Sequence, residues 1–172
     1  MLKGLGALIL IIGSVGYGIS YSLGQKHTLK ELENFQYFFR LLESEVSYHK
    51  ESIPEAVYQV GKRFGGRIGE LVCCLMEKMY AENDGFFAEY WIQGLQEYWK
   101  ESTLCASERK LIEEFVNCVG CRDDSLQISL LSEYREKLER HRKRKEEMLK
   151  GQQRVVMGVS AVGGLVLTIL LL

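Results

Sequence analysis

Proline is nearly absent from this sequence, and the cysteines form no regular framework. Pro54 is the only proline among 172 residues, so almost the whole chain is free of the residue that most strongly breaks helices. The five cysteines are an odd number without the dense spacing of a small secreted domain cross-linked by disulfides. We therefore expect buried or idle thiols in a reducing compartment.

Charge is almost absent from both ends of the chain. Lys3 is the only charged side chain outside residues 26–154. About 20 consecutive apolar residues are enough for a helix to span a bilayer. Gly4–Gly24 and Val155–Leu172 are uncharged runs of about this length. The sequence therefore predicts an N-terminal transmembrane helix over residues 1–24 and a C-terminal one over residues 155–172.

The first apolar run has an alternative interpretation as a signal peptide. Ser20-Tyr21-Ser22 is an acceptable small-x-small cleavage site. Cleavage there would leave an extracytoplasmic binding domain held in the membrane by its C-terminal tail. The thin positive charge before the run and its length favour the transmembrane interpretation.

No stretch alternates apolar and polar residues as a half-buried strand would, whereas helical spacing recurs throughout the middle of the chain. Thr28 and Glu31 have the spacing of a capping box, which predicts a helix that begins near residue 29. Its apolar stripe is Leu32, Phe35, Phe39, Leu42 and Val46. Further helices are expected from Ser52 to Phe64, over 67–81, 86–101 and 103–119, and from Asp124 onward. The expected fold class is all-α, a small helical bundle between the two transmembrane helices, with Trp91 and Trp99 in its core.

Charge within the middle of the chain is segregated by sign. Residues 25–134 carry 12 Lys/Arg against 19 Asp/Glu, whereas residues 135–154 carry 9 against 4. Basic residues beside membrane spans mark the cytoplasmic side, so the helical domain over residues 25–154 is expected in the cytoplasm. The basic collar, over residues 135–154, is expected to contact anionic lipid headgroups rather than nucleic acid. Its central members are Arg140, Arg142, Lys143, Arg144 and Lys145.

The sequence offers no set of residues for catalysis or for cofactor or metal binding. Cys118-Val119-Gly120-Cys121 is a lone CxxC, and a zinc site requires four ligands. The three histidines are far apart in the sequence, and no glycine-rich phosphate loop follows a strand. We therefore expect no enzymatic activity, no cofactor and no metal.

Several stretches together resemble one known family. They are Met1–Ala7, Leu42–Tyr48 followed by Pro54-Glu55-Ala56, the aromatic helix with Trp91 and then Phe115, and Val119–Asp123 with Gln127. These stretches and the glycine-containing C-terminal run resemble the stage III sporulation protein AB family over essentially the whole chain. Val119, where that family usually has leucine, and His49-Lys50, where it commonly has glycine, are small departures.

The resemblance implies a structural membrane protein of endospore formation. Such a protein would lie in the mother-cell membrane around the forespore, in a transenvelope channel complex related to secretion machinery. Its helical domain would be similar to the type II secretion inner-membrane platform, the F component. The implied partners are a cytoplasmic ATPase, other membrane subunits of the complex and possible further copies of the chain.

Five residues of the helical domain are candidates for contacts with such partners. They are Glu43, Glu45 and Tyr48 on the first helix of the domain, and Asp123 and Gln127 at the start of the last helix. An alternative for Asp123 and Gln127 is that they only cap the long final helix.

Overall fold

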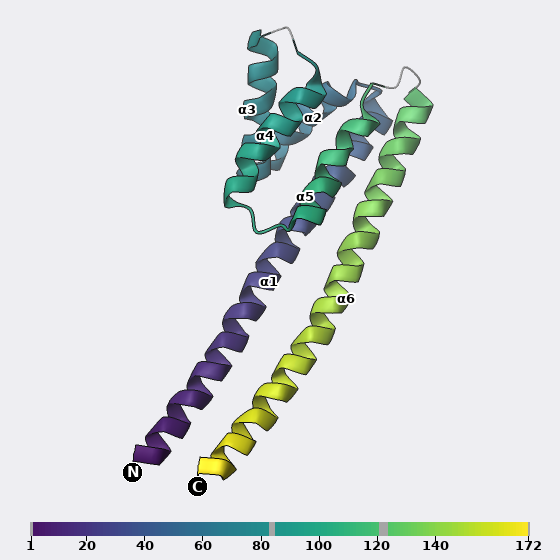
Figure 1. Ribbon diagram of the computed structural model, residues 1–172. Helices are drawn as coiled ribbons and strands as arrows, with labels where there is room; N and C mark the ends of the chain where they lie inside the picture. The colour runs from purple at the N-terminus through teal and green to yellow at the C-terminus, as the bar shows by residue number, and fades with distance from the viewer. Residues whose placement is uncertain (1, 83–84, 121–123, 172) are drawn as a thin grey trace. The chain divides into compact units, whose positions relative to one another are not determined.

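The computed structural model describes the backbone of residues 2–82, 85–120 and 124–171, and the side chains of residues 24–82, 85–120 and 125–151. Within these ranges every regular element is helical and no strand occurs, which confirms the predicted all-α class. The elements, labelled in Figure 1, are α1 (Leu2–His49), α2 (Ile53–Phe64), α3 (Gly66–Glu82), α4 (Phe87–Tyr98), the 3-10 helix η1 (Trp99–Glu101), α5 (Ala106–Glu113), the 3-10 helix η2 (Glu114–Cys118) and α6 (Asp124–Leu171).

The chain forms two compact units. Residues 30–142 make the first, which we call the helical unit, and residues 1–29 with 143–172 make the second. Among the residues whose side chains are described, no helix is long and apolar enough to cross a membrane. The predicted membrane helices over 1–24 and 155–172 lie almost wholly outside those residues, so they stay predictions.

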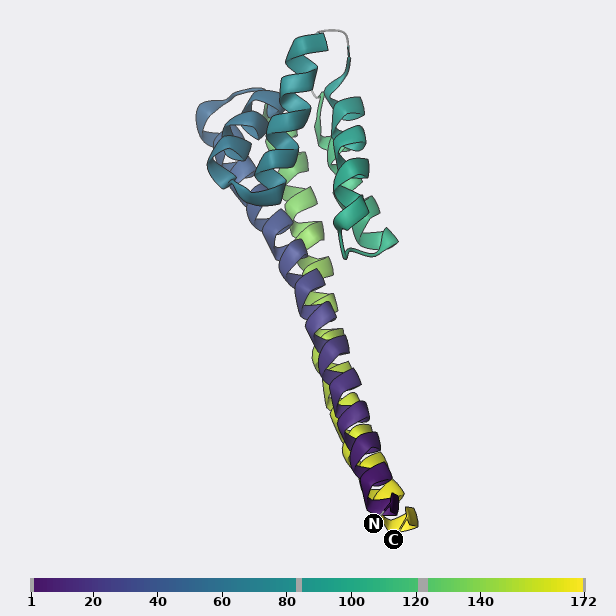
Figure 2. The ribbon, with the colours of Figure 1, turned by 90° about the vertical axis from the view of Figure 1, so that its left-hand side faces the viewer.

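A layer of three short helices builds one side of the helical unit. Pro54 stands in the first turn of α2, where its missing N–H costs no hydrogen bond. Gly65 ends α2 with a φ of 67°, a left-handed conformation that glycine adopts without steric cost. The chain then returns as α3, and α4 lies beside α3 (Figures 1 and 2).

An aromatic cluster joins this layer to the long helices. The Phe39 ring of α1 lies 4.9 Å from the Phe115 ring of η2 and 5.0 Å from the Tyr134 ring of α6, between ring centroids. Trp91 of α4 lies 5.0 Å from Phe115. Four separate segments therefore share one core. The stripe predicted for the first helix is buried at every position, namely Leu32, Phe35, Phe39, Leu42 and Val46.

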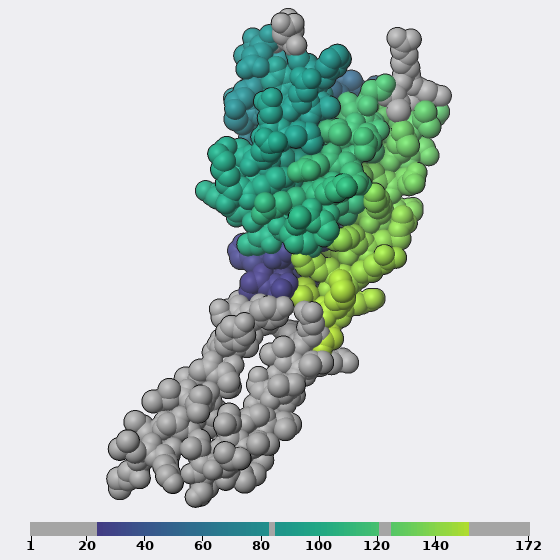
Figure 3. Space-filling view, in the orientation of Figure 1, coloured from purple at the N-terminus to yellow at the C-terminus, as the bar shows by residue number. Residues whose placement is uncertain are grey.

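The N-terminal part of α6 closes this core through one face. Leu131, Tyr134 and Leu138 are buried at helical spacing, as expected for the inward side of an amphipathic helix. Lys137, on the exposed side, pairs with Glu114 of η2. The space-filling view shows the side chains of α5 and α6 in contact along this face of the unit (Figure 3).

Two predicted helix boundaries were wrong. No helix begins near residue 29, because α1 is continuous from Leu2 to His49. Thr28 therefore acts as no cap, and its hydroxyl donates instead to the carbonyl of Gly24 at 3.1 Å. The helix expected over 103–119 is divided: residues 102–105 are non-helical, α5 covers only Ala106–Glu113, and the tighter η2 follows.

Candidate functional site

The two acidic candidates on α1 are engaged in ion pairs within the helical unit. Glu43 pairs with Arg135 of α6, and both side chains are about three-quarters buried. Glu45 pairs with Arg63 of α2 and lies 3.1 Å from Nδ1 of His49. Each carboxylate therefore ties α1 to another helix, and a partner that binds it must share it with an arginine.

The remaining candidates differ in accessibility. Tyr48 is 84% exposed near the C-terminal end of α1, and within the described structure its ring contacts that of His49. Gln127, in the first turns of α6, is buried. Asp123 lies outside the described residues, so its proposed contact and the capping alternative stay predictions. Among the four candidates that the structure describes, Tyr48 is the one that a partner could reach without rearrangement.

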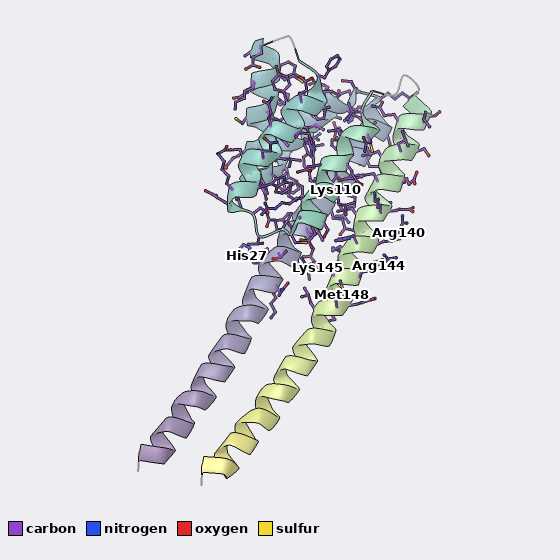
Figure 4. All side chains as sticks on the ribbon, viewed as in Figure 1. His27, Lys110, Arg140, Arg144, Lys145 and Met148 are labelled. Carbon is purple, nitrogen blue, oxygen red and sulfur yellow. The ribbon has the colours of Figure 1, made fainter. Side chains whose placement is uncertain are left out.

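The basic collar lies along α6, where Figure 4 labels Arg140, Arg144 and Lys145. Arg140 pairs with Glu136 one turn earlier, at 3.3 Å, and is exposed. Arg142 reaches across to Glu33 of α1, with 3.2 Å between Nη1 and Oε1, and its side chain is only 17% exposed. The collar therefore contains both an exposed arginine and one that joins α6 to α1.

The second half of the collar keeps much of its charge at the surface. Lys143 and Arg144 are exposed, and Lys145 is half-buried. Lys150 pairs with Glu146 at 2.7 Å. A run of cationic side chains on an exposed helix face can attract anionic lipid headgroups over about a Debye length.

A buried carboxylate that the sequence patterns assigned to capping has a different role. Glu31 is only 8% exposed, and its Oε2 accepts hydrogen bonds from the N–H of Thr103 at 3.1 Å and from the Thr103 hydroxyl at 3.0 Å. Burial, with the Glu31 carboxylate as a second cause, raises the pKa of Tyr98 well above its usual range. A contact between residues 72 positions apart leaves no local signal in the sequence.

A polar surface cluster on α2 and α3 was also not predicted. Tyr80 donates its hydroxyl hydrogen to Glu55 at 2.8 Å, and its ring packs edge-on against Tyr58. Burial and this hydrogen bond raise the pKa of Tyr80 to about 12. Hydrogen bonds from Gln59 and Tyr80 hold the pKa of Glu55 below its ordinary value. The cluster fixes the crossing of α2 and α3 at the surface.

The described cysteines do not gather into a site. Cys74 and Cys105 are exposed, Cys73 is half-buried, and Cys118 is buried. Cys121 lies outside the described residues, so the lone CxxC cannot be placed. Within residues 24–82, 85–120 and 125–151, no group of three or more His, Cys, Asp or Glu side chains is arranged to hold a metal ion.

Comparisons of the sequence and of the structure with known proteins point to the same family. The family model for stage III sporulation protein AB matches residues 3–172. The chain is 20% identical over 172 residues to stage III sporulation protein AB of Bacillus subtilis (strain 168), and the match covers all of both chains. A solved structure of stage III sporulation protein AB superposes with a TM-score of 0.61 at 18% identity, over 72% of this chain and 97% of that one, which shows a shared fold. The chain belongs to the stage III sporulation protein AB family.

Proposed function

We propose that this chain is a structural, non-catalytic membrane component of a sporulation complex, with two transmembrane helices and a cytoplasmic helical domain. The observation that carries the proposal is the segregation of charge along the sequence. Both ends are uncharged apart from Lys3, and the basic residues are concentrated immediately before the second uncharged run. Lysine and arginine beside a span favour the cytoplasmic side, which supports a cytoplasmic location for the domain between the spans.

The helical domain would act as a platform between a cytoplasmic ATPase and the membrane channel. Family membership supports this role, and the resemblance described above implies a domain similar to the type II secretion platform. Tyr48 offers an exposed aromatic ring, and Glu43 and Glu45 lie within two turns of it on the same helix. With Asp123 and Gln127 they form the proposed contact set.

The topology can be tested by labelling single thiols. Cys105 is exposed, so a variant that keeps it and replaces the other four cysteines by serine reports the side of the membrane on which the domain lies. An impermeant maleimide should label Cys105 in opened but not in intact vegetative cells that express the chain. The matched control adds Leu172→Cys to a cysteine-free chain, which should be labelled in intact cells.

Two outcomes would contradict this topology. Labelling of Cys105 in intact cells would reverse the domain and favour the extracytoplasmic alternative. N-terminal sequencing that shows a chain shortened after Ser22 would support the same alternative.

The partner contact can be tested with paired variants and the purified ATPase of the complex. Tyr48→Ser should weaken binding about tenfold, whereas Phe86→Ser should not, although Phe86 is also highly exposed, at 79%. Glu45→Gln should weaken binding more than Arg63→Gln, because both break the same ion pair but only the first removes the proposed contact. Equal effects of Glu45→Gln and Arg63→Gln would show that the ion pair, and not the carboxylate, matters.

A further inference from the structure

The non-helical connection at residues 102–105 is held against α1 by Glu31. Its Oε2 accepts from both donors of Thr103, the backbone N–H at 3.1 Å and the hydroxyl at 3.0 Å. The neighbouring Leu104 is buried, whereas Thr103 itself lies at the surface. The Glu31 carboxylate and the buried Leu104 side chain therefore hold the segment in place.

The connection is internally ordered without help from α1. Leu104 N–H donates to Oγ of Ser102 at 3.1 Å, and Cys105 N–H donates to Glu108 at 2.9 Å. Arg109 donates through Nε to the carbonyl of Leu104 at 2.8 Å and through Nη2 to that of Ser102 at 3.1 Å. Because these bonds lie within the segment and α5, the segment can move as one piece when its bonds to α1 break.

The Glu31 carboxylate is only half satisfied in this arrangement. Its second oxygen, Oε1, is buried and has no hydrogen-bond partner in the described structure. A buried acceptor without a donor loses its hydration without compensation. Movement that brings this oxygen to water removes this penalty and so offsets part of the cost of breaking the two bonds to Thr103.

The Glu31–Thr103 contact is connected to α4 and α3 through the side chains of Tyr98 and Arg67. The Tyr98 ring at the end of α4 packs edge-on against Phe35, one turn after Glu31 on α1. Arg67 at the start of α3 lies over the Tyr98 ring at 4.5 Å and donates to the carbonyls of Tyr98 and Glu101. Displacement of the 102–105 segment therefore acts on the end of α4 and, through Arg67, on the start of α3.

We propose that Glu31 is a releasable latch. A rotation or shift of α1 breaks its two bonds to Thr103, frees the 102–105 connection, and loosens the end of α4 and the start of α3. A movement delivered along α1 is thereby converted into a local opening of the helical unit. The inference rests on these contacts and does not depend on the membrane topology proposed above.

Hydrogen–deuterium exchange of the full-length chain in detergent tests the latch. In Glu31→Gln the amide keeps an oxygen for Thr103 and removes the buried negative charge, whose loss of hydration favours opening, so exchange at the Thr103 amide should slow several-fold. In Glu31→Ala exchange at this amide should quicken at least tenfold, and in Thr103→Val, which loses only the hydroxyl, exchange at residue 103 should quicken by less. The matched control is Glu33→Gln, which removes the Arg142 pair but leaves the latch.

Spore formation tests whether release matters. If the latch must both hold and open, Glu31→Gln and Glu31→Ala should each lower spore counts at least tenfold at unchanged protein level, and Glu33→Gln should lower them less than threefold. Slowed exchange with normal spore counts in Glu31→Gln would overturn the requirement for release. Exchange at Thr103 that stays unchanged in both Glu31→Ala and Thr103→Val would overturn the latch itself, and Thr103→Val decides alone if Glu31→Ala does not fold.

Discussion

Tyr134 of α6 donates its hydroxyl hydrogen to the backbone carbonyl of Leu111 in α5, over 3.2 Å and in the interior of the helical unit. The bond places a polar group inside an aromatic cluster and fixes the axial position of α6 against α5. A buried hydrogen bond of this kind contributes about 1 kcal/mol, and more when its removal leaves the acceptor unpaired.

Tyr134→Phe should therefore lower the free energy of unfolding by about 1–2 kcal/mol, because the Leu111 carbonyl loses its donor while the ring packing is kept. Urea denaturation of the full-length chain in mild detergent, followed by circular dichroism, measures the change. Tyr48→Phe serves as the control at an exposed tyrosine. An unchanged midpoint for Tyr134→Phe would show that water replaces the lost hydroxyl.

Stability should fall at alkaline pH. Burial raises the pKa of Tyr134 and of Tyr98, and the pKa of Tyr80 is raised to about 12. An unfolded tyrosine has a pKa of about 10, so the folded state holds these protons more tightly. Their contribution is complete below pH ~10 and is lost as pH rises through the folded values.

Denaturant midpoints recorded as a function of pH should thus decline above pH ~10. The decline should be shallower in Tyr134→Phe, which lacks one of the shifted groups. Tyrosinate absorbance during alkaline titration provides an independent measure, because Tyr134 should ionise together with unfolding. Ionisation of Tyr134 before any loss of helix would contradict its burial.

The centre of the aromatic cluster should be the position least tolerant of truncation. Phe39 is fully buried between rings of η2 and α6, so Phe39→Ala should cost about 3–5 kcal/mol in lost burial and cavity formation. Phe86→Ala, at a ring that is 79% exposed, should change stability by less than about 0.5 kcal/mol. Equal melting temperatures for the two variants would refute this core assignment.

The crossing of α2 and α3 depends on glycine. A Cβ at Gly61 would clash with Cγ1 of Val72, so Gly61→Ala should cost about 1–3 kcal/mol through overpacking. Gly61→Ala should cost less stability in a chain that already carries Val72→Ala than in the natural chain, because the two positions share one space. The control is Gly151→Ala, a helical site with nothing within 4 Å, which should gain about 0.5–1 kcal/mol. Additive costs at Gly61 and Val72 would contradict the close contact.

The sequence pattern was sufficient for the helical class and for the buried face of α1, because apolar spacing is a local property that packing must satisfy. Leu32, Phe35 and Phe39 were predicted on one stripe, and all are buried. The same reasoning placed Trp91 and Trp99 in the core, where the structure has them. Elements with strong periodicity were predictable for this physical reason.

Contacts between distant residues could not be predicted in the same way. Thr28 and Glu31 have capping-box spacing whether a helix begins there or passes through, and only the position of Thr103 shows what Glu31 binds. Likewise, only the structure shows that the guanidinium of Arg135, at the start of the basic collar, pairs with Glu43. The break at residues 102–105 depends on Arg109 and Glu108 side chains that satisfy its backbone groups, which helix propensity does not register.

The late position of α6 in the chain has a consequence for synthesis. Phe39 emerges from the ribosome long before Tyr134, its ring neighbour in the finished core. The α2–α3–α4 layer, whose contacts are local, can form early, since local contacts close with little loss of loop entropy. The phenylalanine face of α1 is covered only after Leu131, Tyr134 and Leu138 of α6 have been synthesised. A nascent chain therefore carries an uncovered aromatic surface until the first turns of α6 have been translated, and such exposed apolar surface is prone to aggregation during this interval.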